Sequence, residues 1–236
     1  MYRLQENIVA LATAPKTSTI NIIRCSGPSV FNIYKKLVRK KTTPPANTIN
    51  LFLLYCPKTK KVIDQALVSI FKGTKSYTGE HMVEFSTHGG EIVAKKIINA
   101  ILDLDCRMAL AGEFTYRAFV NEKIDLVQAE SINTLIKSES NIENNLSIEN
   151  IVGGFSNSIK KIDQQLANII ITMEHELDFN DNEITFTETK EYMKDINKIY
   201  NKIIYILKNS FITGEKKSKI KLCIAGKPNV GKSSLF

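Results

Sequence analysis

The stretch Gly226-Lys227-Pro228-Asn229-Val230-Gly231-Lys232-Ser233 has the pattern G-x-x-x-x-G-K-[ST] of a phosphate-binding P-loop. In such a loop, backbone N–H groups surround the α- and β-phosphates of a nucleotide, the lysine contacts the β- and γ-phosphates, and the hydroxyl holds Mg²⁺. Residues 219–225 alternate polar and apolar before becoming wholly apolar, which predicts a buried strand leading into the loop. A helix is expected to open at Lys232 with its N-terminus facing the phosphates. Residues 218–236 are therefore predicted to begin an α/β nucleotide-binding domain.

The sequence ends at Phe236, directly after this P-loop. Nucleotide hydrolysis needs further strands, which carry an aspartate for Mg²⁺ and residues that orient the attacking water. We therefore expect that these residues alone do not hydrolyse a nucleotide. The chain is either a piece of a longer protein or the product of a decayed gene, and the sequence leaves both readings open.

Lysine and arginine exceed aspartate and glutamate by eight, and the pI is near 9.2. An excess of lysine favours a nucleic-acid partner, whereas lysine, asparagine and isoleucine also accumulate under A/T codon bias. Charge runs are usually solvated surface, so both explanations stay open. The cations gather in two clusters: Lys35, Lys36, Arg39, Lys40 and Lys41, and then Lys216, Lys217, Lys219 and Lys221.

The four cysteines, Cys25, Cys56, Cys106 and Cys223, lie far apart and form no C-x-x-C pair. This spacing favours ordinary reduced thiols. The sequence contains no apolar run of about 18 to 20 residues, the length a membrane helix needs, and no basic segment followed by an apolar signal core. We expect a soluble, cytoplasmic protein without a membrane partner.

Residues 1–120 are predicted to form an α+β domain. Short runs of β-branched and aromatic residues between turn formers predict five strands: Ile8–Leu11, Thr19–Arg24, Asn50–Tyr55, Gln65–Phe71 and Met82–Thr87. Pro28 is expected at the first position of one helix, and apolar residues at helical spacing predict a second over residues 93–104. The irregular order of strands and helices favours an α+β domain over a strict βαβ alternation.

Residues 121–217 are predicted to be helical. Apolar residues recur at spacings of three and four from Ile159 to Leu177, which is typical of a long amphipathic helix. Thr185-x-x-Glu188 then offers a capping box for another helix that ends near Gly214. We interpret both apolar stripes as the core of a helix bundle.

The extended P-loop, residues 226–236, is similar to that of the Era-like GTPases, in which G-x-P-N-V-G-K-S-S-L is a specific variant. Further stretches upstream resemble one family within that group, the MnmE (TrmE) family of tRNA-modification GTPases. They are Asn7-Ile-Val-Ala-Leu-Ala-Thr-Ala-Pro15, Ile22-Ile-Arg-Cys-Ser-Gly-Pro28, Tyr77-Thr-Gly-Glu80 through His88-Gly-Gly90, Gly112-Glu-Phe-Thr-Tyr-Arg-Ala-Phe119, and Asn121-Glu-Lys-Ile-Asp-Leu-Val-Gln-Ala-Glu130. The resemblance covers the whole chain.

This resemblance implies a tetrahydrofolate-binding-like N-terminal α+β domain, then an α-helical domain into which a G domain is inserted. Residues 121–217 would be the first half of the helical domain, and residues 218–236 the first strand and P-loop of the G domain. The rest of that G domain, the second half of the helical domain and the family's C-terminal Cys-x-Gly-Lys tail are not in these residues.

Family members modify C5 of the wobble uridine, U34, of certain tRNAs with a carboxymethylaminomethyl or aminomethyl group. They act with the FAD-containing protein MnmG, and methylene-tetrahydrofolate supplies the one-carbon unit, for which 5-formyl-tetrahydrofolate is an analogue. The resemblance thus implies a homodimer through the N-terminal domain, a heterotetramer with MnmG, tRNA as substrate, and GTP, K⁺ and Mg²⁺ as ligands. A non-enzymatic remnant that keeps folate binding, dimerisation or partner docking is the alternative. An Era-like GTPase of ribosome assembly is disfavoured by the upstream motifs.

Three residues match folate-binding positions of the family: Arg24, Glu84 and Lys123. Arg24 lies in phase with Ile20 and Ile22 on a strand, so its guanidinium needs an anionic or planar partner, and an internal salt bridge is the plainer reading. Glu84 could accept hydrogen bonds from a pterin ring or be an ordinary strand carboxylate. Lys123 would ordinarily be solvated.

In the P-loop, the backbone amides of Asn229, Val230, Gly231, Lys232, Ser233 and Ser234 would bind GTP. The resemblance assigns Lys232 to the β- and γ-phosphates, Ser233 to Mg²⁺ and Asn229 to K⁺, with a purely structural role as the alternative for Asn229. His88-Gly89-Gly90 either presents amides to an anion or simply turns the chain. Gly112 to Arg117 is predicted to begin a helix, in a structural role or at the folate pocket. The residues offer no candidate general base.

Overall fold

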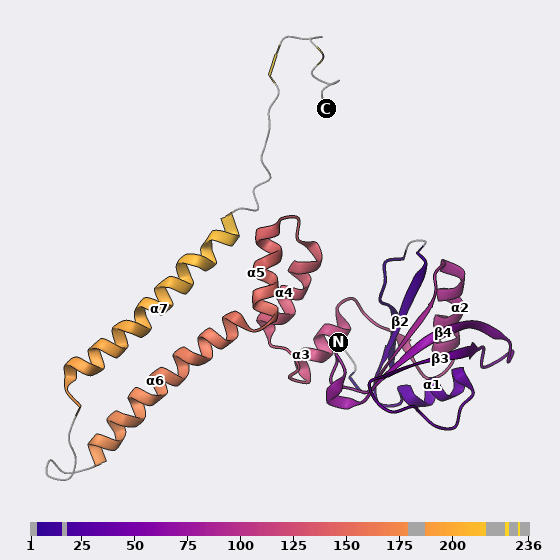
Figure 1. The fold of residues 1–236 in the computed structure, drawn as a ribbon, viewed down its shortest axis with the longest axis horizontal. Coiled ribbons are helices and arrows are strands. Elements are labelled where there is room, and N and C mark those ends of the chain that lie inside the picture. The colour runs from indigo at the N-terminus through magenta and orange to yellow at the C-terminus, as the bar shows by residue number, and fades with distance from the viewer. Residues whose placement is uncertain (1–3, 16–17, 179–186, 216–224, 227–230, 232–236) are drawn as a thin grey trace. The chain divides into compact units, whose positions relative to one another are not determined.

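The computed structural model of the chain describes residues 4–15, 18–178, 187–215, 225–226 and 231 (Figure 1). Its internal contacts divide the chain into two compact units, Met1–Ile136 and Lys137–Phe236. The division falls within the last turn of a helix at residues 126–137 and groups nearly all of that helix with the first unit. The boundaries expected from the sequence, after residues 120 and 217, stay predictions.

The first unit is built on a six-stranded sheet of order β3-β4-β5-β2-β1-β6. Neighbouring strands are antiparallel except for β1 and β6, which run parallel. Five strands fall where the β-branched runs predicted them, which confirms those predictions. The two-residue β6 was not predicted. The strands are β1 (Ile8–Leu11), β2 (Ile20–Ser26), β3 (Thr48–Tyr55), β4 (Val62–Phe71), β5 (Met82–His88) and β6 (Arg107–Met108).

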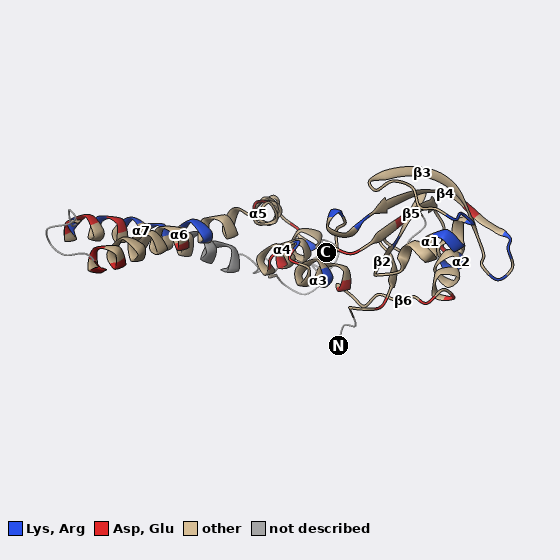
Figure 2. Cartoon of the chain, turned by 90° about the horizontal axis from the view of Figure 1, so that it is seen from below, with Lys and Arg blue, Asp and Glu red and all other residues tan. Residues whose placement is uncertain are grey.

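One face of this sheet carries α1 (Val30–Val38) and α2 (Glu91–Leu102), which contact the strands and each other. Figure 2 shows both helices on the same side of the strands. Inward-pointing residues of alternate strand positions, among them Ile23, Val68 and Phe85, are fully buried beneath them. The α1 helix begins at Val30, after Ser29, so Pro28 precedes the helix and the prediction that it opens the helix is wrong by two residues.

Three short elements complete the unit: the 3₁₀ turn η1 (Gly73–Lys75), α3 (Glu113–Val120) and α4 (Leu126–Lys137). The α3 helix starts where the Gly112-Glu113 pair predicted it, with Gly112 in the left-handed conformation at φ 75°. Left-handed backbone is unfavourable for residues with a Cβ, which explains a glycine at this point. The α3 helix and the loop before β5 border the candidate site.

The second unit contains α5 (Asn141–Ile151), α6 (Gly154–Asp178) and α7 (Thr189–Glu215). The α6 and α7 helices run side by side in opposite directions (Figures 1 and 2), and Lys202 Nζ on α7 donates to Gln165 Oε1 on α6 at 2.9 Å. These two helices confirm the predicted long helices. The α7 helix begins at Thr189, and Thr185 of the expected capping box lies outside the described residues.

These findings confirm the predicted α+β fold of the N-terminal part and the helical fold that follows it. The strand expected over residues 219–225 and most of the P-loop lie outside the described residues, of which Gly231 is described with φ 84°. Within the described part of the chain, none of the helices combines the length and the apolar character needed to cross a membrane.

Candidate functional site

Two of the residues predicted to bind folate, Arg24 and Glu84, face each other across neighbouring strands. Arg24 on β2 is directly paired with Glu84 on β5 in the antiparallel register, and its Nε donates to Glu84 Oε1 at 2.6 Å. Their side chains are 28% and 19% exposed. The pair lies on the sheet face opposite α1 and α2, since buried Cys25, Val83 and Phe85 point the other way. The ion pair that the sequence left open for Arg24 is therefore present, at a surface that a ligand can reach.

Two aromatic rings flank this ion pair. The Arg24 guanidinium carbon lies 5.4 Å from the centre of the Tyr77 ring and 5.6 Å from that of Phe114. Tyr77 belongs to the loop before β5, and Phe114 to the first turn of α3. The Tyr77 hydroxyl is 3.0 Å from Thr115 Oγ1, which ties the loop to the helix. A cation between two π faces is electrostatically favourable, and the same surface offers stacking partners to a planar ligand.

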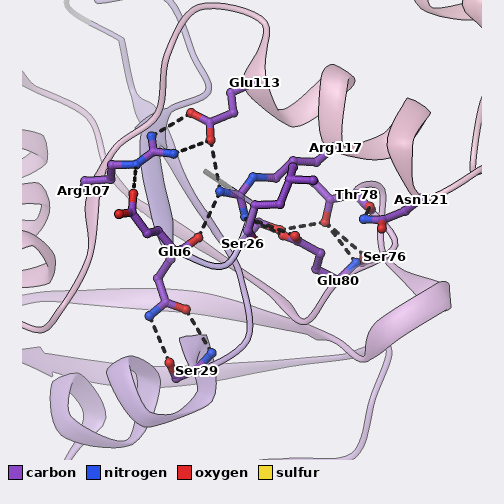
Figure 3. A network of polar contacts seen from close by, with 12 residues as sticks. Glu6, Ser26, Ser29, Ser76, Thr78, Glu80, Arg107, Glu113, Arg117 and Asn121 are labelled. Atoms are coloured by element: carbon purple, nitrogen blue, oxygen red, sulfur yellow. Dashed lines mark hydrogen bonds and ion pairs between the residues drawn. The ribbon is translucent and has the colours of Figure 1, made fainter. Parts of the chain in front are cut away.

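Arg117, on the same helix as Phe114, forms the centre of a buried polar network (Figure 3). Its side chain is fully buried, and its Nη1 donates to both carboxylate oxygens of Glu80 at 3.1 and 2.9 Å. Its Nη2 donates to Glu113 Oε1 at 3.0 Å and to the carbonyl oxygen of Glu6 at 2.9 Å. One side chain thus joins α3, the loop before β5 and the N-terminal segment.

Glu113 is held from two sides. Arg107 on β6 donates to both of its carboxylate oxygens, at 2.8 and 2.6 Å, and the Leu110 backbone N–H donates to Oε2 at 2.8 Å. Burial alone would raise the pKa of Glu113, but the bonds from Arg107, Leu110 and Arg117 outweigh it and hold the pKa at about 2. The carboxylate therefore stays ionised well into the acid range.

Stability is accordingly expected to fall in acid because of Glu113. Its folded-state pKa lies below the unfolded value near 4.3, so its contribution is fully present above about pH 5 and is lost as the pH falls toward 2. The full loss is about 3 kcal/mol, of which about 2 kcal/mol has occurred by pH 2.5. Urea unfolding between pH 7 and pH 2.5 measures it, with Glu113→Gln as the comparison. If the free energy of unfolding fell equally steeply in acid for the wild type and for Glu113→Gln, the low pKa of Glu113 would be contradicted.

The same network fixes the Tyr77-Thr78-Gly79-Glu80 motif. Ser26 Oγ on β2 lies 2.7 Å from Thr78 Oγ1 and donates to Glu80 Oε2 at 2.8 Å, and Asn121 Nδ2 donates to the Thr78 carbonyl at 2.7 Å. Gly79 has φ 79°, and a Cβ there would lie 2.8 Å from Asn121 Cβ and 3.2 Å from Lys123 Cγ. The motif is therefore packed directly against the segment that follows α3.

Lys123, the third predicted folate residue, lies in that segment. Its Nζ donates to the Thr74 carbonyl oxygen of η1 at 2.7 Å, and its side chain is exposed. The structure thus places Lys123 against the loop that carries Tyr77, whereas the Arg24–Glu84 ion pair is formed without it. It borders the site without joining the ion pair.

The His88-Gly89-Gly90 segment turns the chain between β5 and α2. The Gly89 N–H donates to the Thr19 carbonyl at 2.9 Å, and a Cβ on Gly89 would lie 1.6 Å from the Ser18 carbonyl oxygen. These contacts favour the turn over the anion-binding alternative for Gly89. The backbone N–H and ring Nδ1 of His88 both lie within hydrogen-bond distance of the Asp64 carboxylate, at 2.9 and 2.7 Å.

Several residues of the site were given no individual role from the sequence, namely Tyr77, Glu80, Phe114 and Arg117, although the segment from Gly112 to Arg117 was allowed a place at the folate pocket. All four lie inside quoted motifs, and the spacing of Glu113 and Arg117, four residues apart on one helix, is a recognisable ion-pair signal. No local pattern could have shown that Arg107 and Glu80 complete the network, because they come from elsewhere in the chain. A hollow of about 370 Å³ lies nearby, lined by residues that include Leu4, Gly79 and His81, but not by Arg24, Glu84 or Lys123.

Comparison with known proteins adds to this geometry. Residues 7–123 match the family model described as "GTP-binding protein TrmE N-terminus", and residues 126–214 match "MnmE helical domain". The order of an α+β domain and a helical domain in the structure agrees with the order of these two models. The proteins named "tRNA modification GTPase MnmE" from Flavobacterium johnsoniae, Cytophaga hutchinsonii and Francisella tularensis subsp. holarctica are 40%, 36% and 38% identical to the chain over 239, 232 and 234 residues. The chain belongs to the MnmE (TrmE) family.

Each of these three alignments covers 98% of the chain and 50 or 51% of the relative. The chain therefore spans about half the length of the curated relatives it matches. Asn229, Val230, Lys232, Ser233 and Ser234, the predicted GTP, K⁺ and Mg²⁺ positions other than Gly231, lie outside the described residues.

Proposed function

We propose that the chain is the N-terminal part of a GTP- and folate-dependent tRNA-modifying protein. With the flavoprotein MnmG, the whole protein would add a carboxymethylaminomethyl or aminomethyl group to C5 of U34 in tRNA, in the cytoplasm. The observation that carries the folate part of this proposal is the Arg24–Glu84 pair on the open face of the sheet, with the Arg24 guanidinium close to the Tyr77 and Phe114 rings.

The chemistry of this site suits a reduced folate. A pterin is planar and carries several N–H donors, so it can stack on an aromatic side chain while its donors reach the Glu84 carboxylate. Arg24 supplies a planar cation for the ring or for an anionic group of the ligand. When bound, methylene-tetrahydrofolate would supply the one-carbon unit. The chain's own residues would bind and orient it, with Lys123 at the border of the site.

The GTP part of the proposal is supported by the P-loop sequence and by the names of the relatives. The amides of residues 229–234 would bind the phosphates, Ser233 would hold Mg²⁺ and Asn229 would hold K⁺. The 236 residues alone are not expected to hydrolyse GTP, because the aspartate and water-orienting residues of such sites follow the P-loop in the chain. Measurable GTP turnover by these residues alone would contradict this.

We further propose that the chain forms a homodimer through its first unit and that this dimer assembles with MnmG as a heterotetramer. Support for the dimer comes from an apolar surface formed by Ile49, Leu51 and Leu53 of the edge strand β3 and by Leu67 of β4, which are 42 to 67% exposed. Contiguous exposed apolar side chains mark interaction sites in soluble proteins. Sedimentation equilibrium of the wild type and of Leu51→Lys decides whether this surface holds the dimer together.

The second unit would be the first half of a helical domain. The α6 and α7 helices contact each other, yet Ile170, Ile171, Leu177, Tyr200 and Tyr205 remain 54 to 85% exposed. The relatives are twice as long as the chain, which leaves ample sequence for a segment that covers these residues. The second candidate function is a module that binds folate and partners without GTPase activity.

Folate binding is expected to depend on Arg24. Calorimetric titration of the 236-residue chain with 5-formyl-tetrahydrofolate should show saturable binding. Arg24→Ala should weaken this binding at least about tenfold, because removing one strong charged contact costs about 1.5–3 kcal/mol. Lys95→Ala, which removes an exposed cation paired with Glu91 on α2, is the control. Absence of binding by the wild type, or equal binding by both variants, would overturn the folate assignment.

A further inference from the structure

The N-terminal part of the chain contains a long stretch without acidic residues. Residues 7–63 include ten lysines and arginines and no aspartate or glutamate, although the whole chain has 24 acidic residues. A/T codon bias adds lysine but does not remove acidic residues, which are frequent in the rest of the chain. The positive charge of this stretch is therefore not explained by codon bias alone.

The fold brings two separate groups of these cations together. One group lies at the C-terminal end of α1 and directly after it, and the other in the turn between β3 and β4 (Figure 2). The Arg39 guanidinium carbon lies 5.0 Å from the centre of the Tyr55 ring, and Tyr55 is the last residue of β3 before that turn. We call the exposed cations of both groups, apart from Lys58, the basic surface: Lys36, Arg39, Lys40, Lys41, Lys60 and Lys61.

Few acidic groups offset this charge locally. Lys58, also in the turn, is paired with Asp103 at 2.6 Å. The first acidic residue after the stretch, Asp64, is bonded to His88, and Glu91 is paired with Lys95. Favourable interaction with the α1 dipole accounts for Lys36 in the last turn, but Lys40 and Lys41 lie beyond the helix, and Lys60 and Lys61 lie on another element.

We propose that the basic surface binds the phosphate backbone of tRNA. This inference rests on the proposed function for the identity of the RNA. Lysines in two groups act as separate point charges that neutralise phosphates without reading sequence. The α1 helix turns Ile33, Leu37 and Val38 into the core, so it presents its charged side to a partner. A helix that binds a membrane would present its apolar side instead.

The test compares two variants of the 236-residue chain that lose the same charge. In the surface variant, Lys40, Lys41, Lys60 and Lys61 are replaced by glutamine. In the control variant, Lys160, Lys161, Lys190 and Lys194 of α6 and α7, which are also exposed, are replaced by glutamine. Urea unfolding of both variants should match the wild type, since surface substitutions of this kind change stability by no more than about 0.5 kcal/mol each.

Binding of a fluorescently labelled tRNA transcript is then measured from 50 to 200 mM salt. Each lost phosphate contact lowers the slope of log affinity against log salt by about 0.7–0.9, so the surface variant should lose about 3 units of slope and at least tenfold in affinity at the lowest salt. The control variant should keep the slope of the wild type. Equal losses in both variants, or wild-type binding by the surface variant, would overturn the inference.

Two further measurements separate this inference from the proposed function. The surface variant should bind folate as tightly as the wild type. Absence of folate binding by the wild type would count against the proposed function, whereas the RNA result would still hold. Vesicles with and without anionic lipid are the second probe. Binding to anionic vesicles with no binding to tRNA would replace RNA by a membrane as the partner and overturn the inference.

Discussion

Replacing Arg117 by methionine is expected to lower the free energy of unfolding of the first unit by about 3–5 kcal/mol. The guanidinium is fully buried, and its loss removes both bonds to the Glu80 carboxylate and the bond to the carbonyl of Glu6, so that Glu80 keeps the bond from Ser26 Oγ but loses its cation. Glu113 keeps its bonds from Arg107, so the largest penalty falls on Glu80. Methionine has a similar length and lacks charge, and so isolates the electrostatic loss from a cavity.

Equilibrium urea unfolding, followed by circular dichroism, measures the effect. Lys95→Met removes an exposed ion pair on α2 and should change stability by less than about 0.5 kcal/mol. The double variant Arg117→Met with Glu80→Gln should recover part of the loss, because the carboxylate charge that lost its cation disappears. A loss for Arg117→Met no greater than that of Lys95→Met would show that the network does not support the fold.

Replacing Gly79 by alanine is expected to destabilise the first unit by about 3 kcal/mol or more. The residue has φ 79°, where a Cβ costs about 1–2 kcal/mol. The added Cβ would also lie 2.8 Å from Asn121 Cβ, so the segment after α3 has to shift, which disturbs the bond from Asn121 to Thr78 as well. Overpacking of this kind costs about a further 1–3 kcal/mol.

Gly112→Ala is the matched control for Gly79→Ala. Gly112 has nearly the same backbone conformation, φ 75°, but a Cβ there would meet nothing within 4 Å. The difference between the two variants in thermal or urea unfolding therefore reports the packing against Asn121 and Lys123. If the two substitutions were equally destabilising, the close contact between the motif and the segment after α3 would be ruled out as the reason for the glycine.

The sequence predicted those features that depend on local patterns. Alternating β-branched residues identified five strands, and the apolar spacing from Ile159 to Leu177 identified α6. The two-residue strand β6 carries no such pattern, because its place in the sheet depends on its pairing with β1. The predicted start of α1 at Pro28 is two residues too early. Proline favours the first helical position, but in the structure Ser29 is the residue before the helix and Val30 is the first helical residue.

The candidate site was foreseen only in part. Family resemblance pointed to Arg24 and Glu84, but their contact depends on the register between β2 and β5, which lie 60 residues apart. Tyr77 and Phe114 gain a role only when the loop and α3 meet, and this meeting is arranged by Arg117 from its buried position. Residues whose roles arise from long-range contacts cannot be found from spacing along the chain.

The contacts between the two ends of the first unit have a consequence for its folding. The first strand pairs with residues 107–108, and Arg117 reaches back to Glu6 across 111 positions. Closing a loop of about 100 residues costs about 4 kcal/mol of chain entropy before any contact forms. During synthesis from the N-terminus, Arg117 must therefore leave the ribosome before this unit can complete its fold. Until then the first strands lack their contacts with residues 107–117.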